Sequence, residues 1–188
     1  MDKIKLGVLV GGTSIEREVS KKSCENLLAN LDENKYDITV YHLPADGNTE
    51  WAKNIISNPP QIVLSALHGG NGENGSIQGF LHCLNIPYIG SKVLSSAICM
   101  NKAMAKTVMK ANHIQVPDHV FVMRGVDFSQ YEESIKLMGF PLIVKPNRGG
   151  SSIGVIVARN MEDIHYGIKN IMETYDDDVL IEKFIDGK

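Results

Sequence analysis

The stretch IKLGVLVGGTSIEREVS, residues 4–20, decides the fold of the first half of the chain. Its nearly continuous apolar run ends in two glycines and is followed by a helical pattern over 14–31 and a second apolar run, DITVYHLP. A helix over about 49–57 and a third run, QIVLSAL at 61–67, continue the alternation. Apolar strands separated by helices predict a parallel sheet that is covered on both faces.

Two polar, glycine-rich segments follow strands of this predicted sheet. GGTSIE, residues 11–16, follows the first strand, and HGGNGENG, residues 68–75, follows the third. In open sheets of this kind, ligands bind beyond the carboxyl ends of the strands. Because glycine loses the most conformational entropy on folding, its clustering indicates a backbone that turns tightly or approaches something closely. We therefore expect a ligand site at this edge of the sheet.

The composition of the 188 residues disfavours several classes of function. The formal net charge of -3 and the scattered lysines and arginines do not favour nucleic acid, so we expect small-molecule partners. The three cysteines have no CxxC spacing, which predicts buried reduced thiols and no zinc site. No signal-peptide pattern is present, and no apolar run approaches the roughly 18 residues that span a bilayer. We expect a soluble cytoplasmic protein with no membrane partner.

After about residue 91 the pattern changes. Residues 95–114 predict one long helix with an apolar face. The elements expected after it are HVFVM, a helix over about 128–138, FPLIVKP, the loop NRGGSS, IGVIVA, another helix and DVLIEKFI. Strands that pair across loops as well as across helices predict an α+β domain with an antiparallel sheet. We place the boundary between the two domains after residue 93, which gives domains over 1–93 and 94–188.

In the first half of the chain, Glu16 and His68 are the candidate functional side chains. Thr13 and Glu16 fit a capping box, in which a hydroxyl and a carboxylate bind free amides at the start of a helix. Capping alone would explain Glu16. His68 follows a strand and precedes glycines, so two interpretations stay open: the backbone of its loop satisfies the ring, or the ring faces a ligand.

In the second half, lysines and serines are the candidates for binding an anion. Lys102 and Lys106 lie four residues apart on one helix face, and for Lys106 we expect an ordinary solvated side chain. Lys145 ends an apolar strand and precedes a glycine loop that carries Ser151 and Ser152. An ammonium group that faces exposed amides and hydroxyls predicts a phosphate cradle. The loop is not a Walker A motif, because its lysine precedes the glycines and it connects two apparent strands.

The stretch VLIEKFIDG, residues 179–187, predicts a half-buried strand. Alternation of side chains along a strand places Glu182 and Phe184 on one face. Ile181, Lys183 and Ile185 lie on the other face.

Five segments together resemble one family. In chain order they are GGTSIEREVS, LHGGNGENGSIQG, IPYIGSKVLSSAICMNK, FPLIVKPNRGGSSIGV and VLIEKFIDG. Their order and spacing resemble those of the D-alanine:D-alanine ligases of the ATP-grasp superfamily, and the resemblance covers essentially the whole chain. It implies an α/β architecture: a Rossmann-like, parallel-sheet pre-ATP-grasp domain followed by an incomplete α+β ATP-grasp domain.

The resemblance implies ATP-dependent ligation of two D-alanines for peptidoglycan synthesis. The carboxylate of the first D-alanine would become an acyl phosphate, which the amine of the second would attack. Carried over to this sequence, Glu16 would hold the ammonium group of the first D-alanine and Ser151 would bind Glu16. His68 would lie beside the carboxylate of the same D-alanine.

For the nucleotide, the resemblance implies that Lys102 and Lys145 neutralise the ATP phosphates and that Ser152 covers them. Glu182 and the backbone of Lys183 and Ile185 would bind adenine. The resemblance also implies a possible homodimer through the N-terminal domain.

This sequence departs from the family pattern in three respects. Asn74 and Asn101 stand where the family usually has aspartate. Because each keeps a hydrogen-bonding side chain, we expect these changes to adjust the function of the site and not to abolish it. The family's ribose-binding carboxylate, transition-state arginine and Mg²⁺ ligands follow the last matching segment and have no counterpart among these residues. The resemblance therefore implies a fragment of a longer enzyme that holds no metal ligands and does not ligate by itself.

Other functions stay open at this point. One is a related ATP-grasp ligase, such as an enzyme that joins D-alanine to D-lactate. A second, of a different class, is a non-catalytic module that binds nucleotide or amino acid or that mediates dimerisation. A dinucleotide-dependent oxidoreductase is less favoured, because GVLVGGTSIE lacks the GxGxxG pattern and no acidic residue ends a strand about 20 residues further on.

Overall fold

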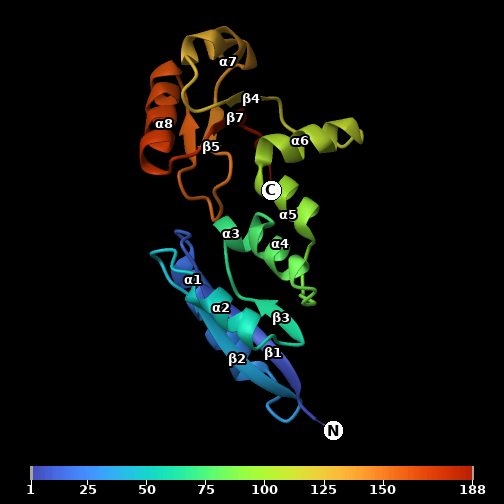
Figure 1. Ribbon diagram of the computed structural model, residues 1–188. Coiled ribbons are helices and arrows are strands. Elements are labelled where there is room, and N and C mark those ends of the chain that lie inside the picture. Colours follow the sequence, from blue (N-terminus) through green and yellow to red (C-terminus); the bar gives the residue numbers. More distant parts are fainter. Residues whose placement is uncertain (1, 188) are drawn as a thin grey trace. The chain divides into compact units, whose positions relative to one another are not determined.

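The structure is a computed structural model that describes residues 2–187 (Figure 1). The chain forms two compact units, which divide between Ala97 and Ile98. The division lies inside helix α5 (Val93–Met100), and the domain boundary predicted after residue 93 coincides with the start of this helix. We describe the first unit and the second unit separately.

The first unit contains a three-stranded parallel sheet, as predicted. Its strands are β1 (Ile4–Gly11), β2 (Tyr36–Leu43) and β3 (Ile62–Ser65), in the order β2-β1-β3. The helices are α1 (Arg17–Asn30), α2 (Glu50–Ser57), α3 (Gly70–Glu73) and α4 (Ser76–Cys83). The segment IPYIGS, residues 86–91, contributes a single parallel bridge between Val63 and Tyr88.

Both faces of this sheet are packed. On one face, Leu6, Val8 and Val10 of β1 pack with Cys24 of α1. On the other face, Leu9 joins a cluster to which α2 and α4 contribute, through Ile55, Ile77 and Leu81 among others. Because β1 is buried on both sides, its sequence is a continuous apolar run and not an alternating one. The prediction of a doubly covered sheet is confirmed.

The second unit contains a four-stranded antiparallel sheet, also as predicted. Its strands β4 (His119–Val122), β5 (Leu142–Pro146), β6 (Ile156–Ala158) and β7 (Val179–Lys183) lie in the order β4-β7-β5-β6. The helices are α6 (Lys102–Ala111), α7 (Glu132–Met138), which follows a 3-10 turn at Phe128–Tyr131, and α8 (Met161–Thr174).

The two faces of the second sheet differ in chemistry. Val144 and Ile181 point into a core to which α7 and α8 contribute. Residues that pair directly across antiparallel strands share a face, and Ile143 pairs with Glu182 while Lys145 pairs with Leu180. The face opposite the core therefore carries one acidic and one basic side chain. The acidic residue is Glu182 and the basic residue is Lys145, and both are candidate site residues from the sequence analysis.

The single long helix predicted over residues 95–114 is wrong. The structure has two helices, α5 and α6, which are separated at Asn101. Asn101 has an extended backbone, and its side chain accepts a hydrogen bond from the Met104 N–H at 3.0 Å. An asparagine N-cap starts a new helix at this position because it satisfies one of the amides that a helix start leaves unpaired.

The prediction that all three thiols are buried is wrong for two of them. Cys24 is buried under the first sheet, whereas Cys83 and Cys99 are exposed. The apolar face of α4 passes through Ile77 and Leu81, and Cys83 lies two residues beyond it, on the opposite side of the helix. The helical period of the sequence therefore predicts that Cys83 points outward, whereas composition alone does not.

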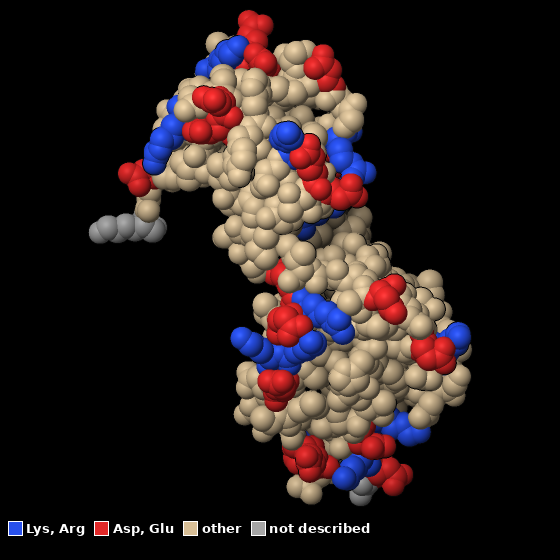
Figure 2. Space-filling model, turned by 90° about the vertical axis from the view of Figure 1, so that its left-hand side faces the viewer, with Lys and Arg blue, Asp and Glu red and all other residues tan. Residues whose placement is uncertain are grey.

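The surface and the helices add two further observations. On the face shown in Figure 2, basic and acidic side chains lie next to one another. Among residues 2–187, no helix combines the length and the apolar character needed to cross a membrane.

Candidate functional site

In the first unit, the two glycine-rich segments meet at the carboxyl ends of the strands. Gly69 has a φ of +64°, and a Cβ added to it would lie 2.5 Å from Glu16 Oε2 and 2.6 Å from Ser14 Oγ. Only glycine lets the backbone adopt this conformation and approach the Glu16 carboxylate so closely. The predicted close approach in HGGNGENG is therefore to a carboxylate that is itself buried.

The predicted capping box is wrong. Helix α1 begins at Arg17, after Glu16, and the chain enters it through a turn in which the Arg17 N–H donates to the Ser14 carbonyl at 3.1 Å. Ser14 Oγ accepts a hydrogen bond from the Glu16 N–H at 3.1 Å. Thr13 instead lines a cavity. The extra turn shifts the helix start by three residues, so a threonine and a glutamate at capping-box spacing do not cap it.

His68 is held by a side chain. Its Nε2 lies 2.8 Å from the Ser23 hydroxyl of α1, so a side chain satisfies the ring and not the backbone of its loop. The contact fixes the ring at the end of β3 beside Gly69. His68 also lines the cavity of the first unit described below. Sequence reasoning missed Ser23, because a serine within a helical pattern gives no sign that it faces a loop.

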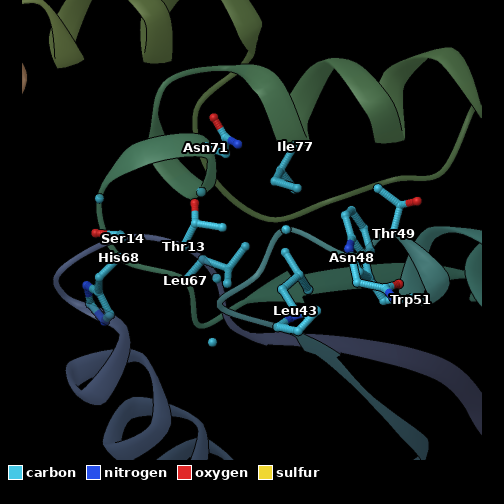
Figure 3. A pocket seen from close by; sticks show the side chains of 16 residues that line it. Thr13, Ser14, Leu43, Asn48, Thr49, Trp51, Leu67, His68, Asn71 and Ile77 are labelled. Atoms are coloured by element: carbon cyan, nitrogen blue, oxygen red, sulfur yellow. The ribbon is translucent and has the colours of Figure 1, made fainter. Parts of the chain in front are cut away.

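A cavity of about 130 Å³ lies at the same edge of the sheet (Figure 3). Apolar side chains such as Leu43, Leu67 and Ile77 line it together with the polar Thr13 and Asn48. His68 and Ser14 lie toward one end of the view and Asn48, Thr49 and Trp51 toward the other. Such a mixture of apolar and uncharged polar groups suits a small organic molecule.

In the second unit, a cavity of about 280 Å³ brings four predicted residues together. It is lined by Lys102, Lys145, Ser151 and Ser152, with the glycines at 149 and 150. The Lys102 ammonium group donates to the Gly149 carbonyl. Ser151 and Ser152 have φ values of +50° and +58°, and non-glycine residues adopt this left-handed conformation uncommonly. Consecutive strained residues in a loop are typical of a ligand-binding segment.

Glu182 lies between two lysines. Its Oε2 is 2.8 Å from Lys106 Nζ, and its Oε1 contacts Lys145 Nζ. Burial raises the pKa of Glu182, but the hydrogen bonds and charges of Lys106 and Lys145 outweigh that effect and hold the pKa below its ordinary value. The expectation that Lys106 is solvated is wrong: its side chain is only 12% exposed, because it reaches the carboxylate.

The remaining two predicted nucleotide residues lie outside the cavity lining. The Lys183 N–H donates to the Asp118 carbonyl at 2.9 Å, so a backbone contact of Lys183 with adenine would have to use its carbonyl. Ile185 follows the end of β7, and its side chain is exposed. The adenine-binding role of Glu182, Lys183 and Ile185 stays a prediction.

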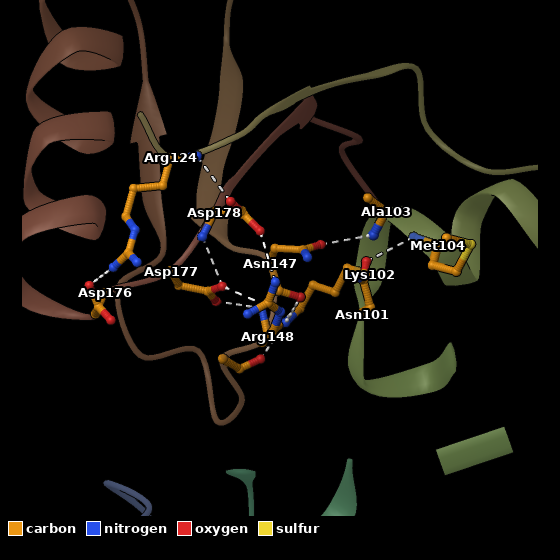
Figure 4. Close-up of polar contacts among 11 residues, drawn as sticks. Asn101, Lys102, Ala103, Met104, Arg124, Asn147, Arg148, Asp176, Asp177 and Asp178 are labelled. Carbon is orange, nitrogen blue, oxygen red and sulfur yellow. Dashed lines mark hydrogen bonds and ion pairs between the residues drawn. The ribbon is translucent and has the colours of Figure 1, made fainter. Parts of the chain in front are cut away.

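Asn147 fixes the start of helix α6 against the end of β5 (Figure 4). It is fully buried. Its side-chain Oδ1 accepts from the Ala103 N–H at 2.9 Å, and its carbonyl accepts from the Lys102 N–H at 3.1 Å. Together with the Asn101 cap, these bonds satisfy the first three amides of the helix. Sequence reasoning missed Asn147, because a helix cap supplied by a distant loop has no local pattern.

Aspartates hold the base of the glycine loop. The Arg148 N–H donates to Asp177 Oδ2 at 2.6 Å, and the Arg148 guanidinium donates to Asp178 Oδ2 at 3.0 Å (Figure 4). These bonds tie the segment after β5 to the segment before β7. The run of three aspartates at 176–178 is the one sequence signal that could have identified this anchor.

The two asparagines that depart from the family pattern both accept backbone hydrogen bonds. Asn101 Oδ1 accepts from Met104, as described above, and Asn74 Oδ1 accepts from the Ser76 N–H at 3.0 Å. An aspartate could accept the same bonds.

Comparisons with known proteins identify the family. The model of the N-terminal part of D-Ala–D-Ala ligases matches residues 49–91, and the model of their C-terminal part matches residues 108–188. The chain belongs to the D-alanine–D-alanine ligase family. A curated D-alanine–D-alanine ligase from Bacillus anthracis is 40% identical over 186 residues, which are 98% of this chain and 59% of that protein. The chain thus spans less than two thirds of the length of this ligase.

Solved D-alanine–D-alanine ligase structures share the fold. The ATP-complexed ligase from Bacillus anthracis has a TM-score of 0.84 at 35% identity, over 98% of this chain and 60% of that one. The VanG D-Ala:D-Ser ligase from Enterococcus faecalis has a TM-score of 0.82 at 27% identity, over 99% of this chain and 64% of that one. Ligases named for different second substrates therefore share the fold of these residues, so the fold does not select the second substrate.

Proposed function

We propose that this chain supplies the nucleotide site and part of the amino-acid site of an ATP-dependent D-alanine–D-alanine ligase that acts in peptidoglycan synthesis. The observation that carries the proposal is the cavity of the second unit, where Lys102, Lys145 and the strained serine loop converge. Family membership and the ATP complex of a relative support ATP as the ligand.

The cavity suits the phosphates of a nucleotide. Phosphoryl transfer requires a protein mainly to position the phosphates and to neutralise their charge. Lys102 and Lys145 would supply the charge, and Ser151 and Ser152 would supply hydroxyl and amide donors from the loop. Bound ATP would supply the phosphoryl group that activates a carboxylate.

In the first unit, Glu16 and His68 are the proposed contacts of the first D-alanine. A buried carboxylate beside Gly69 can pair with the ammonium group of a small zwitterion. His68, held by Ser23, would lie beside the carboxylate of the same amino acid.

Mg²⁺ stays a prediction drawn from the resemblance. The part of the chain that the structure describes contains no group of three or more His, Cys, Asp or Glu side chains placed to hold a metal ion.

Calorimetry tests the nucleotide site on the 188-residue chain. We expect ATP to bind and the substitutions Lys102→Met and Lys145→Met to weaken its binding by tenfold or more, about 1.4 kcal/mol, because each removes a charge from the phosphates. Lys110→Met is the matched control, because Lys110 lies on the same helix as Lys102 but is exposed. A wild-type chain that does not bind millimolar ATP would contradict the proposal.

A second titration tests the amino-acid site. We expect D-alanine to bind more weakly to Glu16→Gln than to the wild-type chain, because the neutral amide cannot pair with the ammonium group. L-Alanine serves as the control ligand. Equal affinity of the two proteins for D-alanine would remove Glu16 from the proposed site.

Two further parts of the proposal concern assembly and location. The homodimer through the first unit is tested by light scattering, in which a monomer mass at micromolar concentration would exclude it. A cytoplasmic location is tested by cell fractionation.

A further inference from the structure

The structure places three charged side chains on the polar face of the second sheet. Lys145 extends from β5, Glu182 from β7 and Lys106 from helix α6. The two carboxylate oxygens of Glu182 contact different lysines: Oε1 contacts Lys145, and Oε2 lies 2.8 Å from Lys106 Nζ. The exposed fractions of these side chains are only 20% for Lys145, 12% for Lys106 and 10% for Glu182.

Of the three, Lys145 lines the cavity of the second unit, whereas Lys106 and Glu182 are not among its lining residues. Without a ligand, the Lys145 ammonium group is paired with Glu182. A phosphate that binds in the cavity must compete with this carboxylate for Lys145. The competition has a cost if Glu182 is then left without a cation, because a buried unpaired carboxylate is strongly unfavourable.

We infer that Lys106 is a positioning residue that keeps Glu182 neutralised when Lys145 turns from the carboxylate to a phosphate. The two lysines and one glutamate carry one excess positive charge, so one ammonium group can remain on Glu182 while the other binds the ligand. Without Lys106, Lys145 would be the sole cation of the three and would stay on the carboxylate. This inference rests on the proposed nucleotide site.

The inference gives Lys106 a role that a solvated helix side chain would not have. Lys106 would strengthen phosphate binding although it does not line the cavity. Its effect should disappear when Glu182 is neutral, because there is then no carboxylate to hold Lys145. A purely structural contribution of Lys106 would not depend on the charge of Glu182 in this way.

The test is a double-mutant cycle on ATP affinity, measured by calorimetry on the full 188-residue chain. The variants are Lys106→Met, Glu182→Gln and the double substitution, with Lys110→Met as the matched control on the same helix. Met keeps the apolar length of the lysine stem, and Gln keeps a hydrogen-bond acceptor at position 182. Circular dichroism confirms that each variant is folded before the titration.

We expect Lys106→Met to weaken ATP binding by about tenfold. Glu182→Gln also changes the proposed adenine contact, so it serves as the reference for the double variant. The double variant should bind ATP within about twofold of Glu182→Gln, because no carboxylate then holds Lys145. Lys110→Met should bind like the wild-type chain.

Two outcomes would overturn the inference: wild-type affinity in Lys106→Met, or a double variant that binds ATP about tenfold more weakly than Glu182→Gln. If Lys106→Met does not fold, Lys106→Gln takes its place in both backgrounds. A wild-type chain that does not bind ATP would instead contradict the proposed function, so the two failures are distinguishable.

Discussion

Lys106 Nζ of helix α6 lies 2.8 Å from Glu182 Oε2 of strand β7, and both side chains are largely buried. This ion pair attaches α6 to the sheet on the face that carries Lys145. Pairing with the lysines keeps Glu182 ionised below its ordinary pKa, although burial opposes this.

The depressed pKa of Glu182 predicts a dependence of stability on pH. A lowered pKa in the folded state means that the unfolded chain binds a proton more readily, so the contribution of Glu182 is present above the ordinary value of 4.5. It is lost as the pH falls from 4.5 through the lower pKa of the folded state. Urea unfolding between pH 3 and 7 should therefore show a smaller acid-induced loss in Glu182→Gln than in the wild-type chain. If the free energy of unfolding fell equally with pH in the two proteins, the prediction would be contradicted.

Much of the architecture follows from local patterns in the sequence. A nearly continuous apolar run such as residues 4–11 predicts a parallel strand that is buried on both faces. Lys145 and the loop after β5 were also predictable, because a strand end and glycines mark them, whereas Lys102 was identified only through the family resemblance. The contacts that complete the site were not predictable, since they join residues far apart in sequence. Lys106 has no local sign that it reaches Glu182.

The errors at helix starts have the same origin. Asn101 and Thr13 both occupy plausible capping positions, yet only Asn101 caps a helix. The start of α1 is instead set by the turn through Ser14, and that of α6 also depends on Asn147. Local propensity cannot distinguish these cases, because tertiary hydrogen bonds decide them.

Removal of the Asn147 side chain should destabilise the second unit. Asn147→Ala leaves the Ala103 N–H without its acceptor, and loss of a helix cap costs about 1–2 kcal/mol in the free energy of unfolding. The control is Asn112→Ala at the other end of α6, where the side chain donates to the Val108 carbonyl at 2.9 Å but is exposed to water, so a change within about 0.5 kcal/mol is expected. Urea denaturation followed by circular dichroism measures both. Equal effects of the two substitutions would show that the Asn147 cap stabilises the protein no more than an exposed asparagine does.

Gly69 and Gly79 should respond to alanine in opposite directions. Gly69→Ala places a methyl group against Glu16 and Ser14 at a positive φ, and we expect a loss of at least about 1–2 kcal/mol in stability together with weaker D-alanine binding. Gly79 lies within α4, and an added Cβ would meet nothing within 4 Å. Gly79→Ala should therefore stabilise the protein by up to about 1 kcal/mol. Thermal melting of the two variants distinguishes the signs, and a neutral Gly69→Ala would argue against the close approach.

Thiol reactivity should separate the three cysteines. Cys83 and Cys99 are exposed and should react rapidly with an aromatic disulfide reagent in the native protein. Burial raises the pKa of the Cys24 thiol, so Cys24 should react only on unfolding. The reagent should release two equivalents of its aromatic thiol from the native chain and three equivalents in denaturant. Cys24→Ala should abolish only the third equivalent.

Strand β7 lies between β4 and β5, although it follows both of them in the chain. During synthesis, β4 and β5 must therefore wait for residues 179–183 to leave the ribosome before they can form the centre of their sheet. Such non-local pairing slows folding and leaves strand edges open in the meantime. Nascent chains of the second unit should consequently depend more on chaperones than those of the first unit, whose β1 and β2 are joined through α1.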